Sequence, residues 1–348
     1  LNVWRKKMSD NNTMTDEVIL QVKGLKTYFH TDEGIVKAVD GITFDLHKGE
    51  TVGIVGESGS GKSVTNLSIM NLVQTPPGKI EGGEVLFHGE DLLKMDDKTI
   101  RDIRGNKISM IFQDPMSSLN PFLKISTQMI ETIQLHQGLD KKAAREKAIE
   151  MLTLAGIPAA AERIDCYPHQ FSGGMRQRVM IAMGLSCNPE ILIADEPTSA
   201  LDVTISAQIL ELMQDLTKRL GTAVIMITHS LGVVAGMCDT IMVMYAGRVV
   251  ESGKTVDIFK EPKHPYTQGL IKSVPRLDKK NEERLFSIQG QPPNVIDLPP
   301  CCPFYPRCEK AMDICKKKYP SVAKFENGHC ASCWLYADEA VISKGEEE

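Results

Sequence analysis

"GIVGESGSGKSV", residues 53–64, is the stretch that decides the fold, because it joins an apolar run to a glycine-rich turn with one lysine. The apolar residues before the turn read as a buried strand, and Gly56 stands five positions before Gly61, which Lys62 and Ser63 follow. Glycines allow backbone N–H groups to turn toward phosphate oxygens, Lys62 supplies a positive charge, and the Ser63 hydroxyl can reach Mg²⁺. The pattern predicts a strand, a phosphate-binding loop and a helix that begins near Gly61. A chance glycine-rich turn is the alternative, and the helix-like run after the loop disfavours it.

The bulk composition is that of a soluble globular protein, long enough for two domains or for one large domain with an appendage. The 348 residues are 42% hydrophobic and 24% charged, with a formal net charge of −5 at pH 7. This charge gives no general electrostatic case for nucleic acid or an anionic membrane as a partner. The sequence has no run of 18 uncharged apolar residues that could span a bilayer. Its polar start lacks the apolar stretch of a secretory signal, so we expect a cytosolic chain.

A second apolar run ends in two carboxylates. In "ILIADEP", residues 191–197, largely apolar residues deliver Asp195 to the C-terminal end of a predicted strand, where ligands of α/β proteins bind. Asp195 would hold the water shell of Mg²⁺, and Glu196 would polarise the attacking water as a general base. Two carboxylates after a strand are often only a charge pair at a helix N-terminus, but phosphoryl transfer needs such a pair beside a phosphate loop.

The order of predicted elements indicates a mostly parallel sheet with flanking helices. Residues 18–55 alternate short strand-like runs with turns, which predicts an antiparallel start before the buried strand. Residues 122–165 have helical periodicity and no strand signal, so we expect a helical insertion there. Strands and helices alternate again from residue 189. After Pro262 the composition changes, with a plausible linker at 275–284 and an acidic tail at the end.

The segment "FSGGMRQR", residues 171–178, precedes a helix-like run and predicts a second anion site. Ser172 offers a hydroxyl, and Gly173 and Gly174 offer closely spaced backbone N–H groups at a helix N-terminus. A chain with two sites for a γ-phosphate, one at the phosphate loop and one at Ser172 to Gly174, is explained if the two sites bind different nucleotides. We therefore expect two such subunits in the working assembly.

Six of the nine cysteines crowd into the last part of the chain, whereas Cys166, Cys187 and Cys238 are scattered. The scattered three are most simply small buried hydrophobic residues. In a cytosolic chain, a cluster of six indicates a metal or iron–sulfur site before it indicates disulfides. The clustered cysteines are Cys301, Cys302, Cys308, Cys315, Cys330 and Cys333.

Four of these cysteines have the spacing C-x5-C-x6-C-x17-C, namely Cys302, Cys308, Cys315 and Cys333. Four thiolates can hold zinc tetrahedrally or bind a 4Fe–4S cluster. Zinc sites prefer C-x2-C pairs at both ends, and only Cys330 with Cys333 offers one, so the long gaps favour the larger cluster. Zinc, unmetallated thiols and a disulfide remain as alternatives.

Taken together, these motifs closely resemble the ATP-binding subunits of ABC transporters, whose signature is LSGGQ. This chain has Phe171 for leucine and Met175 for glutamine, and it keeps the Ser-Gly-Gly that faces phosphate. The resemblance covers roughly residues 18–340 and is closest to oligopeptide and dipeptide importers. "HPYTQGLIKSVPR" (264–276) is similar to the segment that follows the ATPase core in that branch, and "QDPMSSLNP" (113–121) looks like its long Q-loop. The peptide substrate class rests on this resemblance alone.

The resemblance implies a role for each matching residue. Gln113 resembles the Q-loop glutamine, His229 the switch histidine that touches the γ-phosphate, and Phe29 the aromatic that stacks on adenine, with neighbouring Tyr28 as the alternative. The implied catalytic residues are Glu196, His229 and Gln113, and the implied ligands of Mg²⁺ are Ser63, Gln113 and Asp195. The implied ATP contacts are Phe29, Gly56, Ser58, Gly59, Ser60, Gly61, Lys62, Ser63 and Val64. The signature that acts on the partner's nucleotide is Ser172, Gly173, Gly174 and Met175, and the D-loop at the dimer interface is Ser199, Ala200, Leu201 and Asp202.

The implied fold is α/β: an ABC-type P-loop ATPase core, with a RecA-like sheet and an antiparallel β subdomain, plus a helical subdomain and a small C-terminal Cys-rich domain. We expect a disordered start at 1–17, the ATPase domain at 18–260 with the helical subdomain at about 117–182, the C-terminal domain at 261–340 and an acidic tail at 341–348. Peptide-importer ATPases that resemble this chain carry a 4Fe–4S cluster at cysteines matching 302, 308, 315 and 333. A structural staple is the simplest role for it.

The resemblance thus implies an ATP hydrolase that, with ATP and Mg²⁺, powers import of di- and oligopeptides from the cytoplasmic face of the inner membrane. The expected partners are a second homologous ATPase subunit, two transmembrane permease subunits and an extracytoplasmic peptide-binding protein, and no nucleic acid. The ATPase of a nickel importer, a non-transport ABC ATPase with an iron–sulfur module, and an iron–sulfur assembly or redox protein are the alternatives.

Overall fold

The computed structural model describes residues 17–114, 118–199, 201–274, 287–296 and 298–336. The expected disordered start, the linker at 275–284 and the acidic tail at 341–348 lie outside these residues, apart from residue 17. The strands form two sheets, one of eight strands in the order β11-β12-β10-β9-β3-β8-β7-β6 and one of four strands in the order β2-β1-β4-β5.

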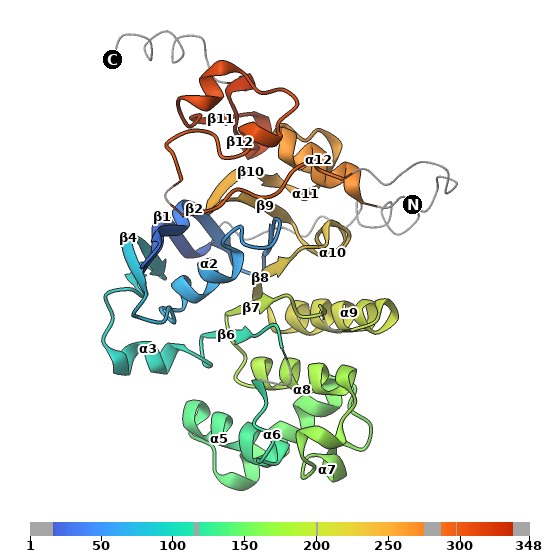
Figure 1. Ribbon diagram of the computed structural model, residues 1–348. Helices are drawn as coiled ribbons and strands as arrows, with labels where there is room; N and C mark the ends of the chain where they lie inside the picture. Colours follow the sequence, from blue (N-terminus) through green and yellow to red (C-terminus); the bar gives the residue numbers. More distant parts are fainter. Residues whose placement is uncertain (1–16, 115–117, 200, 275–286, 297, 337–348) are drawn as a thin grey trace.

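Five adjacent strands of the eight-stranded sheet, from β9 to the edge strand β6, are parallel (Figure 1). β7 and β8 are buried at every position, as expected for parallel strands with both faces covered. Alternate residues of β7 point to opposite cores, since Ile191 and Ile193 join one hydrophobic cluster while Leu192 and Ala194 join the other. The parallel strands are β3 (Thr51–Val55), β6 (Ile108–Ile111), β7 (Ile191–Asp195), β8 (Ala223–Thr228) and β9 (Thr240–Tyr245).

The four-stranded sheet is antiparallel, and it confirms the antiparallel start predicted from residues 18–55. Its buried residues pack against the phosphate-loop helix and the near face of the main sheet. Thr27 and Ser68 lie within 2.7 Å of each other through their hydroxyl oxygens, which ties this sheet to the helix. Its strands are β1 (Val18–Thr31), β2 (Gly34–His47), β4 (Gly78–Phe87) and β5 (Glu90–Asp91).

The helical insertion predicted at residues 122–165 is confirmed. Figure 1 shows its helices gathered with α8 at one end of the molecule, beyond β6 and β7. Asp140 and Ser172 begin two of these helices by accepting a hydrogen bond from the backbone three residues later. The helices of this lobe are α5 (Ile125–Gln137), α6 (Lys141–Leu154), α7 (Ala160–Arg163) and α8 (Gly173–Leu185). The other α-helices of the described residues are α2 (Lys62–Ile69), α3 (Asp97–Ile103), α9 (Val203–Leu220), α10 (Leu231–Met237), α11 (Thr255–Lys260) and α12 (Pro265–Ser273).

The Cys-rich region, expected as a small separate domain, instead extends the main sheet. β10 (Arg248–Lys254) forms a hairpin with β9, and β12 (Cys330–Ser332) pairs with β10. β11 (Val322–Lys324) then forms the outer edge. The rest of this region is held in short 3₁₀ turns, among them Tyr305–Arg307 and Asp313–Lys316. Because these strands continue the main sheet, the region is anchored through backbone hydrogen bonds to the core.

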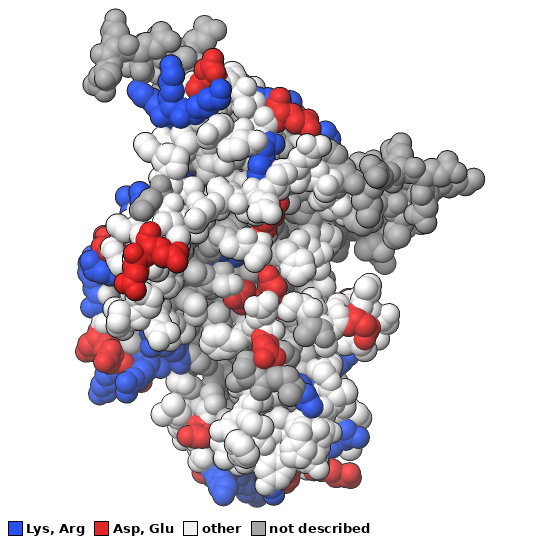
Figure 2. Space-filling view, in the orientation of Figure 1, with Lys and Arg blue, Asp and Glu red and all other residues white. Residues whose placement is uncertain are grey.

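Figure 2 shows basic and acidic side chains interspersed over the face that it presents. Charge of mixed sign agrees with the small net charge and offers no single-sign field for steering a highly charged partner to this face. Within the described ranges, no helix has both the length and the apolar character needed to cross a membrane.

A buried carboxylate connects the C-terminal strands to the core. Glu251 of β10 is 1% exposed and accepts hydrogen bonds from the backbone of Lys263 at 2.6 Å and of His264 at 2.9 Å. Its side chain also lies 2.7 Å from Nε2 of His329, which is itself buried. One side chain therefore joins β10, the start of α12 and the segment before β12.

We expect Glu251→Ala to lower the free energy of unfolding by about 3 kcal/mol, because three hydrogen-bonding partners, those at His264 and His329 buried, would lose their acceptor. Glu261→Ala is the matched control, since Glu261 is 76% exposed in its ion pair with Lys263 and its loss should leave the free energy of unfolding nearly unchanged. Urea unfolding of both variants measures the difference. Equal stability of the two would contradict the anchoring role of Glu251.

Candidate functional site

The candidate site forms where four parallel strands end at the same edge of the sheet. The register pairs Val55 with Thr228, Asp195 with Ile227, and Ile111 with Ala194. The residues that follow these strands therefore emerge side by side, as is usual for ligand sites of parallel sheets. These emerging segments are the glycine-rich loop after β3, Glu196 after β7, His229 after β8 and Gln113 after β6.

The glycine-rich loop turns tightly against the antiparallel sheet and leads into α2, as predicted. Gly61 has a φ of 100° and caps the helix, and a Cβ built on it would lie 2.1 Å from the carbonyl oxygen of Ala38. Only glycine fits this position. Of the other expected ATP contacts, Ser58 and Gly59 are exposed on the loop, Ser60 is buried, and Val64 is half-buried in the first turn of α2.

The Lys62 ammonium is enclosed by the loop. Its Nζ donates to the carbonyl oxygens of Gly56 and Glu57, both at 2.9 Å, and to the Ser60 hydroxyl at 3.4 Å. Burial lowers the pKa of Lys62, while the carboxylates of Glu196, Asp195 and Glu57 oppose this shift. The loop therefore holds one positive charge inside its turn.

Two hard oxygen ligands meet beside the loop. The Ser63 hydroxyl donates to Oδ1 of Asp195 at 3.2 Å, although the two residues are 132 positions apart. Asp195 is 6% exposed, and burial raises its pKa, with the Ser63 hydrogen bond opposing the shift. A hydroxyl and a carboxylate in contact are the donor types that Mg²⁺ prefers.

The second carboxylate, Glu196, lies between the other two predicted side chains. Nε2 of Gln113 donates to Oε2 of Glu196 at 3.0 Å, and Nδ1 of His229 lies 3.5 Å from the same oxygen. Glu196 has a φ of 45°, a backbone conformation that non-glycine residues seldom adopt outside functional sites. The structure thus brings together Ser63, Gln113, Asp195, Glu196 and His229.

The signature segment lies apart from this group, at the start of α8 in the helical lobe (Figure 1). Ser172 caps the helix and accepts a hydrogen bond from the backbone N–H of Met175 at 3.4 Å. Ser172 and Gly173 are exposed. A Cβ built on Gly174 would lie 2.8 Å from Ile205 of α9, so the signature packs against the helix that follows the D-loop.

The D-loop lies between the β7 carboxylates and α9. The backbone N–H of Ser199 donates to the carbonyl oxygen of Glu196 at 3.2 Å, and Asp202 caps α9 by accepting from Ile205 at 2.9 Å. Leu201 lies near Gly173, 3.7 Å from a Cβ built there. Ala200 lies outside the described residues, as do residues 115–117 of the expected Q-loop.

The two candidate adenine-stacking aromatics have different environments on β1. Tyr28 donates a 2.7 Å hydrogen bond to Asp40, whose other oxygen accepts from Arg248. Phe29 is half-buried, and its ring edge approaches Gly78 of β4, 3.0 Å from a Cβ built there. The Tyr28 hydroxyl is thus engaged within the chain.

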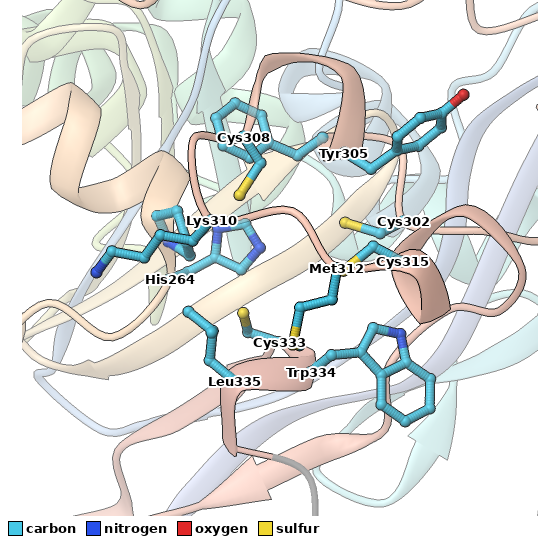
Figure 3. A pocket seen from close by; sticks show the side chains of 12 residues that line it. His264, Cys302, Tyr305, Cys308, Lys310, Met312, Cys315, Cys333, Trp334 and Leu335 are labelled. Atoms are coloured by element: carbon cyan, nitrogen blue, oxygen red, sulfur yellow. The ribbon is translucent and has the colours of Figure 1, made fainter. Parts of the chain in front are cut away.

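A second candidate site lies in the Cys-rich region. Figure 3 shows a small pocket into which the side chains of Cys302, Cys308, Cys315 and Cys333 converge. Cys301 and Cys330 do not line it. Burial raises the pKa of Cys302 to about 12 and that of Cys333 to about 11. Within the described segments, no three His, Cys, Asp or Glu side chains form a group that could hold one metal ion.

The other cysteines vary in burial. Cys187 and Cys238 are buried, as expected for small hydrophobic residues, and Cys166 is half-buried. Cys187 and Cys238 are 7% and 6% exposed.

One contact of the phosphate loop was not anticipated from sequence. The carboxylate of Glu57 accepts two hydrogen bonds from the guanidinium of Arg307, at 2.7 and 3.0 Å. The backbone N–H of Glu57 donates to the hydroxyl of Tyr266 at 2.9 Å. These partners are 250 and 209 positions away, and no local pattern marks them.

Two family comparisons match different parts of the chain. The family described as "ABC transporter" matches residues 39–199, which span the phosphate loop, the signature and the β7 carboxylates. The family described as "Oligopeptide/dipeptide transporter, C-terminal region" matches residues 250–315, which include Arg307 and three of the pocket cysteines.

Curated relatives match over nearly the whole chain. The chain is 52% identical to the dipeptide transport ATP-binding protein DppD of Bacillus subtilis, over 94% of this chain and 98% of the relative. It is 51% identical to the oligopeptide transport ATP-binding protein OppD of Haemophilus influenzae, over 92% and 98%. Among solved structures, the ATP-binding cassette MJ0796, described as a dimer bound to ADP and Pi, matches with a TM-score of 0.61 and 29% identity over 68% of this chain and 98% of that chain. CbiO1 of Clostridium perfringens matches with a TM-score of 0.59 and 28% identity over 71% and 92%.

We expect Gly61→Ala to weaken binding of a fluorescent ATP analogue by more than about 30-fold, because the added methyl cannot fit beside the Ala38 carbonyl without moving the loop. Gly24→Ala is the control: Gly24 also has a positive φ, but a Cβ there meets nothing within 4 Å. It should bind the analogue like the unmodified chain. Equal affinities for all three proteins would show that the loop does not bind the nucleotide.

Proposed function

The chain belongs to the family of oligopeptide and dipeptide transport ATP-binding proteins, and from this membership we propose that it hydrolyses ATP to power the import of di- and oligopeptides. One observation carries the ATPase part of the proposal: the phosphate loop, Asp195, Glu196, Gln113 and His229 converge at one edge of the sheet. The peptide substrate follows from the names of the relatives and from the C-terminal family match.

The residues beside the loop fit a magnesium ion. Ser63 and Asp195 offer a hydroxyl and a carboxylate in contact with each other, and Gln113 reaches the same edge through its contact with Glu196. Magnesium would neutralise charge on the β- and γ-phosphates. Lys62 would exchange its hydrogen bonds to the loop carbonyls for hydrogen bonds to phosphate oxygens, so that its positive charge stabilises the bound ATP.

Glu196 has the environment of a general base. Gln113 and His229 both contact its Oε2, so they orient the carboxylate and leave Oε1 outside these two contacts. We assign to Glu196 the acceptance of a proton from the attacking water. His229, on the neighbouring strand end, would stabilise charge on the transferring phosphate.

We expect Glu196→Gln to lower kcat for ATP hydrolysis by at least about 100-fold, because the amide cannot accept the proton of water. The affinity for a fluorescent ATP analogue should stay within about threefold, since the side-chain shape is preserved. Glu190→Gln is the control, because Glu190 precedes the other end of β7 and pairs with His88 and Lys107. Hydrolysis by Glu196→Gln near the unmodified rate would overturn the assignment.

The exposed start of α8 supports action in trans. In this proposal Ser172, Gly173, Gly174 and Met175 close on a nucleotide held by a second ATPase subunit. The distance in the fold between α8 and the phosphate loop, and the dimeric form of the related cassette MJ0796, support this arrangement (Figure 1). Leu201 of the D-loop would then lie near the subunit interface, because it lies beside Gly173 of the signature.

The full transporter is proposed to contain a second, homologous ATPase, two transmembrane permease subunits and an extracytoplasmic peptide-binding protein. The chain would be a peripheral subunit at the cytoplasmic face of the inner membrane, held there by the permeases. Relatives named for peptide transport, and the peptide-transporter match at residues 250–315, favour peptide over nickel as cargo. The same relatives disfavour a non-transport ATPase.

We further propose that Cys302, Cys308, Cys315 and Cys333 hold a 4Fe–4S cluster. All four line one pocket, whereas Cys301 and Cys330 do not. The side chains of all four cysteines lie around the same pocket (Figure 3), and four cysteine thiolates are the ligands that a 4Fe–4S cluster takes. The cluster would staple the short turns of a region that has few regular elements.

Iron and acid-labile sulfide in anaerobically purified protein test this assignment. We expect about four of each per chain. Cys333→Ser should lose most of the iron and sulfide, and Cys330→Ser should keep them, because Cys333 lines the pocket and Cys330 does not. One zinc per chain without sulfide would show a zinc site in place of the cluster. Protein that contains neither iron nor zinc would overturn the assignment.

A further inference from the structure

The phosphate loop is held from outside by residues of the C-terminal third of the chain. Glu57 is the first residue of the loop after Gly56, and both its backbone and its side chain have partners there. Its N–H donates to the hydroxyl of Tyr266 at the start of α12, and its carboxylate accepts hydrogen bonds from the two terminal guanidinium nitrogens of Arg307. The loop that would hold ATP is thus connected directly to the Cys-rich region.

The ion pair is largely shielded from water. The Arg307 side chain is 5% exposed and that of Glu57 is 25% exposed. Arg307 also donates to the hydroxyl of Tyr245 at 3.2 Å and to the carbonyl oxygen of Gln289 at 3.0 Å. A bidentate, desolvated Arg–carboxylate pair has fixed geometry and is stronger than an exposed pair. It can therefore set the position of the loop.

An aromatic cluster holds the arginine in place. The rings of Tyr245, Tyr266 and Phe304 pack against one another with centroids 4.6 to 5.4 Å apart. The guanidinium lies 5.9 Å from the centroids of both Tyr245 and Phe304. These buried rings come from β9, α12 and the Cys-rich region, so three segments fix one guanidinium.

Arg307 lies in the 3₁₀ turn Tyr305–Arg307, which is next to the cysteine pocket in the sequence. The backbone N–H of Arg307 donates to Phe304, and that of Tyr305 donates to Cys302. Cys302 and Cys308 flank this turn and line the pocket. The turn therefore presents thiols to one side and the guanidinium to the phosphate loop.

Charge makes the pair relevant to nucleotide. A triphosphate is polyanionic, and an uncompensated carboxylate at position 57 would repel it from the loop. Arg307 compensates this carboxylate within hydrogen-bond distance. The arginine thereby acts on the loop through Glu57 and has no need to touch the nucleotide.

We propose that Arg307 is a positioning residue of the nucleotide site, which clamps Glu57 and so sets the affinity for ATP. This inference rests on the proposed ATPase function and extends the nucleotide site to the Cys-rich region. It assigns no part in the chemical step to Arg307, because its contacts reach the loop and not Glu196, Gln113 or His229.

The test measures affinity for a fluorescent ATP analogue, together with KM and kcat for ATP, on the full chain. Arg307→Ala should raise the dissociation constant and KM about tenfold while kcat stays within about twofold. Arg307→Lys should have a dissociation constant and KM between those of the unmodified chain and of Arg307→Ala, because lysine keeps the charge but cannot form the bidentate pair. In a Glu57→Ala background, Arg307→Ala should change the affinity by less than about twofold, because the partner is already absent.

Arg145→Ala is the matched control. Arg145 forms a similar bidentate pair with Asp165, at 3.1 and 2.6 Å, in the helical lobe. Its loss should leave nucleotide affinity unchanged. If Arg307→Ala does not fold, Arg307→Lys and Glu57→Ala carry the test.

The outcomes separate the two proposals. An unmodified chain that binds no ATP would overturn the proposed function. An unmodified chain that binds ATP, with folded Arg307 variants of equal affinity, would overturn only the role of Arg307. If Arg307→Ala lowers the affinity for ATP equally in the unmodified chain and in the Glu57→Ala variant, this role is also overturned, because Arg307 would then act through packing and not through Glu57. A fall in kcat with unchanged affinity would contradict a positioning role.

Discussion

The parallel pairing of β3, β8, β7 and β6 is the constraint on which the site depends. Each strand contributes little chemistry by itself, but their common register makes all four end at one edge. The hydroxyl of Ser63 then meets Asp195, and Gln113 and His229 meet Glu196, without any long side chain having to reach across the molecule. Because the strands are buried on both faces, this register cannot slip without moving apolar side chains out of two cores. The hydrophobic sheet therefore fixes a polar site.

The same sheet explains why the Cys-rich region lies against the ATPase core. A hairpin at Ala246 and Gly247 turns the chain back from β9 to β10, and β10 offers its free edge to β12. Glu251 then satisfies buried donors from two separate segments, and the aromatic rings around Phe304 fill the space between them. A region short of regular elements is in this way held by backbone pairing, one buried carboxylate and aromatic packing. Its pocket of thiols and its arginine are placed by these contacts.

Two carboxylates near the loop have opposite surroundings. Asp195 is buried beside a hydroxyl, in a place suited to a divalent cation. Glu57 is neutralised by an arginine from the far end of the chain. Lys62, between them, bonds to loop carbonyls. The local balance of charge therefore differs from residue to residue, although the net charge of the chain is small and its surface charges are mixed (Figure 2). An anion-binding loop that contains its own carboxylate requires this compensation.

The sequence by itself determined the features that consecutive residues encode. The strand, loop and helix around Lys62, the carboxylates after β7, the helical insertion and the capped start of α8 all depend on patterns within about twenty residues, where backbone preference and hydrophobic periodicity act directly. Only the tertiary structure decided which distant segments meet. It joined the Cys-rich region to the main sheet and paired Glu57 with Arg307 across 250 positions. Such contacts arise from the packing of whole elements, and the residues next to Glu57 or Arg307 in the sequence do not indicate which distant residue each will contact.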